Sequence, residues 1–202
     1  MQIKLEPIYN DKVFILGGGL SIKDTDLDLI KDWPVIGTNA AYTLGTWVDI
    51  CTFIDERFYT WNQKELDAWP NRIITCAPNF KNHKKIEYVK KCEQHAMCWN
   101  PNKLPCPDKG KNVGSTAIAL AAKLGAKKII LLGYDMKVKG GQHNYHKKHQ
   151  HTPRDDVYYR FLVHFKALAA ELKNTDIQVL NATPDSALNL FPKVSLKEAL
   201  NK

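Results

Sequence analysis

Short apolar runs alternate with amphipathic stretches along most of this chain. A run of apolar residues without polar partners is typical of a strand that is buried on both faces, and alternation with helices is typical of a parallel sheet. We therefore predict one α/β domain over residues 1–202. Its fold class is a Rossmann-like, doubly wound, mostly parallel sheet flanked by helices. The predicted strands are Val13–Leu16, Pro34–Gly37, Asp49–Ile54, Arg72–Cys76, Lys128–Leu132 and Ile177–Leu180.

Helix signals stand between these runs. Ser21 followed by Asp24 predicts a capping box after the first strand, and residues 82–92 resemble a lysine-faced helix. Ser115–Leu124 is alanine-rich and ends at Gly125, which predicts a left-handed C-terminal cap. The last long helix begins with Thr152 as N-cap, Pro153 as its first residue and Asp155 as capping partner.

Composition and charge narrow the function classes. No apolar run approaches the roughly 20 residues of a membrane span, and the first residues lack a secretory signal, so we expect a cytoplasmic protein. Five cysteines, an odd number, fit a reducing compartment better than a disulfide framework. The net charge is +8, and residues 81–150 alone carry +11, which attracts anions such as nucleotides or nucleic acid. A solvated lysine-rich surface is the alternative.

The first strand runs into Gly17-Gly18-Gly19 and then Ser21. Such a turn lets backbone amides approach a phosphate at a helix N-terminus. The dinucleotide fingerprint is incomplete, because its third glycine falls on Ile22 and Asn39 stands where NAD-binding proteins carry an acid. The alternative is that these glycines only form a tight turn.

Two further turns fall on the same predicted sheet edge. Gly114 and Ser115 open the alanine-rich helix and are a second candidate anion site. Asp135 ends the strand Lys128–Leu132 and is a candidate ribose contact, metal ligand or turn cap.

Residues 136–150 are basic and rich in histidine, with Gly140-Gly141 inside, and we predict that they form a mobile lid. His151 directly precedes the predicted Thr152 cap, where the helix dipole disfavours an imidazolium ion, so it is the candidate general base. Four histidines, His143, His146, His149 and His151, form a cluster within nine residues. Two alternatives stay open for this histidine cluster, a zinc site and a solvated loop. A second weak zinc candidate is the set Cys92, His95, Cys98 and Cys106.

Together these motifs resemble a known family. The segments Gly-Gly-Gly-Leu-Ser, Gly-Thr-Asn-Ala-Ala-Tyr and Phe-Ile-Asp-Glu, followed by Asn-Val-Gly-Ser-Thr and a strand ending in Gly-Tyr-Asp135, are similar to the 6-hydroxymethylpterin diphosphokinase-like family and the related bacterial family 42 sialyltransferases. The resemblance runs from about residue 13 to 190, with residues 60–110 unmatched. The chain also resembles small phage-encoded members of this group.

The resemblance implies roles for particular residues. In the sialyltransferases the matching loops hold the nucleotide, which implies that Gly18, Gly19, Ser21 and Asn39 contact it here. A third contact is implied at Asp55, where that family has Asn. The second signature implies Gly114, although Val113 stands before it where the family has serine. The family's base follows a mobile lid, a position that His151 fits. Tyr145 corresponds loosely to the lid tyrosines that assist phosphate departure, and His149 is counted with the lid. The candidate site is therefore Gly17, Gly18, Gly19, Ser21, Asn39, Asp55, Gly114, Ser115, Asp135, Tyr145, His149 and His151.

Three functions follow as hypotheses. The first is transfer of a sugar from a nucleotide-sugar donor to an acceptor hydroxyl, with no cofactor or metal required. The second is Mg²⁺-ATP-dependent pyrophosphate or phosphoryl transfer of the diphosphokinase type, with Mg²⁺ at Asp55 or Asp135. The third is a non-catalytic nucleotide or nucleic-acid binding protein. The sequence leaves the acceptor open, with nucleic acid as one candidate, and it also leaves open whether the chain forms a homo-oligomer.

Overall fold

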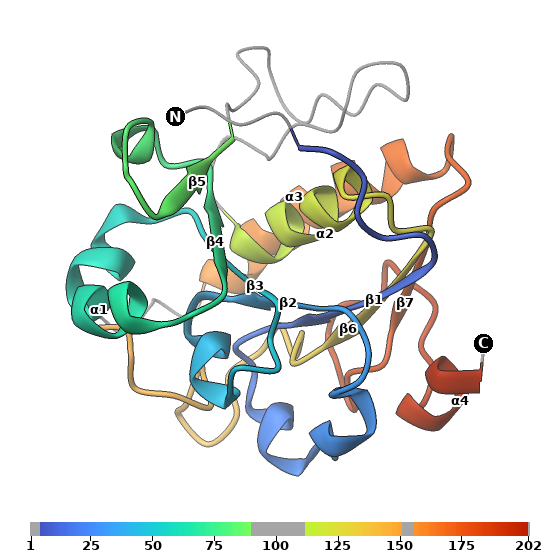
Figure 1. Cartoon of the computed structure of the whole chain (residues 1–202). Helices are drawn as coiled ribbons and strands as arrows, with labels where there is room; N and C mark the ends of the chain where they lie inside the picture. Colours follow the sequence, from blue (N-terminus) through green and yellow to red (C-terminus); the bar gives the residue numbers. More distant parts are fainter. Residues whose placement is uncertain (1–4, 90–111, 151–155, 202) are drawn as a thin grey trace.

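Seven parallel strands form a single sheet in the order β5-β4-β3-β2-β1-β6-β7 (Figure 1). The computed structural model describes residues 5–89, 112–150 and 156–201. The strands are β1 Lys12–Leu16, β2 Val35–Thr38, β3 Ile50–Phe53, β4 Arg72–Thr75, β5 Ile86–Tyr88, β6 Lys128–Leu132 and β7 Gln178–Asn181. The strand order reverses between β1 and β6, and such a switch point is where open parallel sheets bind ligands.

Helices cover both faces of the sheet (Figure 1). One face packs against α2 and α3, and the other packs against α1, α4 and the short 3₁₀ helices. Successive side chains of a strand point to opposite faces of the sheet. In β1, Val13 and Ile15 pack into the core beneath α2 and α3, whereas Phe14 and Leu16 pack into the core beneath α1 and α4. The α-helices are α1 Glu56–Ala68, α2 Val113–Lys123, α3 Val157–Leu172 and α4 Leu196–Asn201, and the 3₁₀ helices are η1 Leu20–Asp24, η2 Leu27–Ile30, η3 Asn39–Leu44 and η4 Pro78–Phe80.

The predicted fold class is confirmed, and all six predicted strands exist with their ends shifted by no more than one residue. Gly125 is also confirmed as the left-handed residue after α2, with φ of 98°. The part of the chain described here contains no helix that is both long and apolar enough to cross a membrane.

Two local predictions are wrong. Residues 86–88 form β5 rather than part of a helix, because Arg72 on β4 holds Glu87 through two hydrogen bonds of 2.8 Å while Ile86 and Tyr88 are buried. Ser21 does not cap a helix with Asp24; it lies inside η1 and its hydroxyl donates to Asp135. The predicted Thr152 cap and the Cys92, His95, Cys98 and Cys106 set lie outside the described residues.

Candidate functional site

The loops after β1 and β6 are tied together at the switch point. Gly19 N donates to Gly133 O at 2.8 Å. Ser21 donates twice to Asp135, from its backbone N to Oδ1 at 3.1 Å and from Oγ to Oδ2 at 2.7 Å. A Cβ at Gly17 would overlap Gly133 O, and one at Gly19 would overlap the Asp135 carboxylate. Glycine is therefore required at both positions for the loops to approach each other.

Gly18 has a different role in the same loop. The amides of Gly17 and Gly19 donate to Leu132 O and Gly133 O, whereas no described acceptor is recorded for the amide of Gly18. Gly18 is also partly exposed, unlike its two neighbours. Of this triplet, it is the residue that can present its backbone to a ligand.

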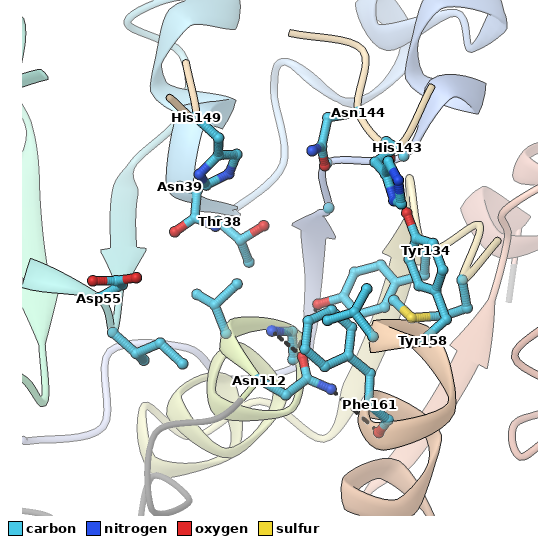
Figure 2. Close-up of a pocket in the computed structure, with 18 of the residues that line it drawn as sticks. Thr38, Asn39, Asp55, Asn112, Tyr134, His143, Asn144, His149, Tyr158 and Phe161 are labelled. Atoms are coloured by element: carbon cyan, nitrogen blue, oxygen red, sulfur yellow. Dashed lines mark hydrogen bonds between the residues drawn. The ribbon is translucent and has the colours of Figure 1, made fainter. Parts of the chain in front are cut away.

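A cavity of about 1130 Å³ opens at this edge of the sheet. Figure 2 shows Thr38, Asn39, Asp55 and His149 along one wall, and Tyr134, Tyr158 and Phe161 along the opposite wall. Strands β1, β2, β3, β4 and β6 contribute residues at or after their carboxyl ends, and α2, α3 and the lid segment, residues 136–150, complete the lining. The cavity thus has a polar wall facing an aromatic one.

Two residues of the polar wall, Asn39 and Asp55, follow the ends of strands β2 and β3. Asn39 has a positive φ of 47°, an unfavourable conformation for a residue other than glycine, and its carbonyl accepts from the buried Cys51 thiol at 3.4 Å. Asp55 caps α1 by accepting from Arg57 N at 3.0 Å, and it also binds the Arg57 guanidinium, with Nη2 at 2.6 Å. These hydrogen bonds hold the pKa of Asp55 below its ordinary value, so its carboxylate is ionised at neutral pH.

The N-terminus of α2 borders the cavity but is already capped. The Asn112 side chain accepts from Gly114 N at 2.9 Å and from Ser115 N at 3.4 Å. Figure 2 shows Asn112 held in turn by Phe161 O. The two amides that the sequence predicts for an anion are therefore occupied, although the helix dipole still favours negative charge here.

The lid segment, residues 136–150, is fastened over the glycine loop. Tyr145 N donates to Gly18 O at 3.0 Å, and the Tyr145 hydroxyl donates to Ala40 O at 3.1 Å. Lys148 Nζ pairs with Glu65, with Oε2 at 2.6 Å, and Asn62 donates to Lys148 O at 3.3 Å. The structure shows the segment closed on the site, and its mobility stays a prediction.

Two histidines of the lid segment lie side by side in the cavity lining, His146 and His149, with ring centroids 5.1 Å apart. Burial, together with the charges of His149 and Lys148, lowers the pKa of His146 from 6.5 to about 4. Burial also lowers the pKa of His149, and the nearby Asp55 carboxylate opposes that shift. The two rings are therefore neutral at pH 7.

A Mg²⁺ site does not fit the carboxylates that the sequence proposed for it. Asp55 is bound by Arg57, Asp135 is bound twice by Ser21, and among the described residues no three potential ligands come together. Mg²⁺ takes oxygen ligands arranged octahedrally, which neither engaged carboxylate offers. The histidine cluster proposed as a zinc site includes His151, which lies outside the described residues. His143, His146 and His149 belong to no group of three candidate metal ligands within the described ranges.

The structure brings most of the predicted site residues together. The cavity is lined by Gly17, Gly18, Gly19, Asn39, Asp55, Gly114, Asp135 and His149. Ser21, Ser115 and Tyr145 lie behind it, engaged with Asp135, Asn112 O and Ala40 O respectively. His151, the candidate base, lies outside the described residues.

Several lining residues are absent from the site that the sequence predicts: Thr38, Asn112, Asn144, His146, Tyr158 and Phe161. Phe161 is an apolar residue of α3, and an apolar helix position indicates a core contact rather than a cavity wall. His146 was visible in the histidine cluster, but only the fold shows which histidines turn inward. Asn144 carries no sequence signal.

The chain is similar in structure to the sialyltransferase CstII from Campylobacter jejuni solved with the substrate analogue cytidine-5'-monophosphate (CMP), with a TM-score of 0.59 and 17% identity over 95% of this chain and 86% of that one. A second CstII structure, with CMP-3FNeuAc, gives a TM-score of 0.54 and 15% identity over 92% and 85%.

This chain has the fold of a sialyltransferase. No family model and no curated protein sequence matches it. At such low identity the similarity to CstII shows the fold alone. It agrees with the sialyltransferase side of the expected resemblance, and the hydroxymethylpterin diphosphokinase side has no support among these comparisons.

Proposed function

We propose that this protein is a glycosyltransferase that binds a nucleotide sugar in the cavity at the carboxyl edge of its sheet and transfers the sugar to an acceptor hydroxyl. One observation carries the proposal. The cavity lies at the switch point of a fold shared with CstII, which was solved in complex with CMP and CMP-3FNeuAc.

The walls of the cavity suit the two ends of a nucleotide. Gly18 offers a backbone amide to a phosphate, and Asn39 and Asp55 offer hydrogen bonds to a ribose or a base edge. Tyr158 and Phe161 offer an aromatic surface on the opposite wall. Asn112 already binds the first amides of α2, so we assign that helix an electrostatic contribution only.

In the proposed reaction the acceptor oxygen attacks the anomeric carbon of the donor sugar. The new carbon–oxygen bond forms as the bond from that carbon to the phosphate oxygen breaks, and the nucleotide leaves with the bonding pair. The acceptor proton passes to His151, the base that the sequence resemblance indicates. The reaction as proposed uses no metal, because the carboxylates at the site are engaged by Arg57 and Ser21.

The test is release of nucleotide from CMP-, UDP- and GDP-linked sugars in the presence of EDTA. We expect release from one of these donors, and a loss of at least about 100-fold in His151→Ala with nucleotide affinity unchanged. Gln142→Ala, an exposed change in the lid segment, is the matched control.

Three results would count against this account. Full turnover by His151→Ala would exclude His151 as the general base. Activity confined to ATP with Mg²⁺ would favour phosphoryl transfer. Nucleotide binding without turnover of any donor would leave a binding protein.

A further inference from the structure

His146 has one ring nitrogen with a partner and one without. Its Nδ1 accepts a hydrogen bond from Lys148 N at 3.2 Å. A neutral imidazole has one proton, so an accepting Nδ1 places that proton on Nε2. This Nε2 is buried and has no hydrogen-bond partner among the described residues.

The unpartnered nitrogen lies beside the open residue of the glycine loop. His146 Nε2 is 3.5 Å from the position that a Cβ on Gly18 would occupy, and Asn144 Oδ1 is 2.7 Å from the same point. Gly18 is also the loop residue whose amide lacks a described acceptor. Two unused N–H donors therefore belong to neighbouring residues at one corner of the cavity.

The surroundings hold the ring in place and keep it uncharged. Tyr145 packs edge-on against it at 4.9 Å between centroids, and His149 packs on it at 5.1 Å. The backbone after it is fixed by the Lys148 contacts with Glu65 and Asn62. The low pKa of His146 makes it a neutral donor at pH 7.

We propose that His146 is a ligand-binding residue whose Nε2–H donates a hydrogen bond to a phosphate oxygen that the bound nucleotide places beside Gly18. A glycine loop at a sheet switch point is where phosphates bind, and a buried donor without an acceptor is unfavourable until a ligand supplies one. This inference rests on the proposed function. Because Nε2 is closed off from solvent, the lid segment must shift slightly for the oxygen to reach it.

Calorimetry on three variants tests the role of the nitrogen. The probes are CMP, UMP, GMP and AMP, followed by the nucleoside that matches the tightest of them. His146→Phe keeps a ring but has no donor, and we expect it to bind the monophosphate about tenfold more weakly and the nucleoside equally well. His146→Gln restores a donor near Nε2, and we expect it to stay within about threefold of the wild type. Gln142→Ala should match the wild type.

The outcomes separate this inference from the function on which it rests. If no monophosphate binds the wild-type protein, the proposed function fails and this inference fails with it. If one binds and His146→Phe binds it equally well, only the role of His146 is overturned. An equal loss for monophosphate and nucleoside would also overturn it, because the contact would then not be to the phosphate.

Nitrogen NMR of the wild-type ring tests the same point without a variant that might misfold. We expect the Nε2–H tautomer at pH 7, and a change in the Nε2 resonance when the monophosphate is added. The Nδ1–H tautomer, or an Nε2 resonance that does not respond to a bound monophosphate, would overturn the proposal.

Discussion

Gly18 and Gly19 are adjacent, but the structure gives them different roles. A Cβ on Gly19 would overlap the Asp135 carboxylate, and it would lie 2.7 Å from the rigid backbone oxygen of Gly133. A Cβ on Gly18 would crowd the end of the Asn144 side chain, which can move aside, and would lie at ordinary contact distance, 3.5 Å, from His146 Nε2. Gly19 is therefore needed for the two loops to pack together, whereas the space beside Gly18 can admit a ligand.

We therefore expect Gly19→Ala to lower the free energy of unfolding by about 2–3 kcal/mol, and Gly18→Ala to lower it by less than about 1 kcal/mol. Urea denaturation followed by circular dichroism measures both. Similar losses in the two variants would show that the loops are not packed as described.

Only part of this loop's structure is encoded in neighbouring residues. The glycine triplet and Asn39 were recognised, because turn chemistry is local. That the amides of Gly17 and Gly19 are used within the fold was not predictable, because their acceptors Leu132 and Gly133 are more than a hundred positions away. The role of Ser21 was wrong for the same reason, since Asp135 competes with the local cap.

At the scale of elements, the Ser21–Asp135 contact joins the β1 loop to the β6 loop. Both side chains are buried, at 9% and 7% exposure, so neither can exchange its partner for water. Removing the carboxylate leaves an amide and a hydroxyl unpaired. We expect Asp135→Ala to cost about 2–3 kcal/mol of stability and Ser21→Ala about 1–2 kcal/mol.

The double variant Ser21→Ala/Asp135→Ala shows whether the two losses of stability come from one shared contact. We expect a coupling energy of about 1 kcal/mol or more in a double-mutant cycle by urea denaturation. Strictly additive losses would mean that the two loops are held by other contacts.

The buried histidines of the lid segment should make the stability of the protein depend on pH. The folded-state pKa of His146 is about 4 against 6.5 when unfolded, so between these values the unfolded chain binds a proton that the folded chain does not. The stability that the neutral His146 ring contributes is therefore fully present above about pH 6.5 and is lost as the pH falls towards 4. The pKa of His149 is also lowered, so His149 acts in the same direction. The Glu65 carboxylate, whose pKa is lowered by Lys148, loses its contribution only below about pH 4.3.

Replacing His146 should remove part of this dependence. We expect the loss of stability between pH 7 and pH 5 to be smaller in His146→Gln than in the wild type, by roughly 1–2 kcal/mol. Unfolding curves at the two pH values give the comparison, with Gln142→Ala expected to follow the wild type. Equal losses in wild type and His146→Gln would show that the ring is not buried in a neutral form.

Among the elements, β5 shows what the sequence did not reveal. Lys84 and Lys85 before it and Lys90 and Lys91 after it suggested a polar helix face, but Ile86 and Tyr88 are buried and Glu87 pairs with Arg72 on the neighbouring strand. A strand of three residues is too short to show the alternation of buried and exposed side chains, so it cannot be recognised without its partner strand. The longer runs, such as Lys128–Leu132, were predictable as strands because apolar residues occupy both faces of the strand.

At the scale of the whole molecule, the sheet gathers distant segments at one edge. Asn39, Asp55, Gly18 and His149 all line one cavity because parallel strands end on the same side. Their convergence was predictable from the alternating pattern, whereas the aromatic wall of Tyr158 and Phe161 depends on how α3 packs against α2. The central claim is that this cavity binds a nucleotide.

A thermal-shift panel tests that claim most directly, with CMP, UMP, UDP, GDP, ADP and ATP each measured with and without Mg²⁺. Ligand binding to the folded state raises the melting temperature, and at a hundred times the dissociation constant it adds about 2.7 kcal/mol of stability. The account predicts a rise with at least one of these nucleotides that does not require Mg²⁺. A melting temperature that no nucleotide changes, with or without the metal, would contradict it.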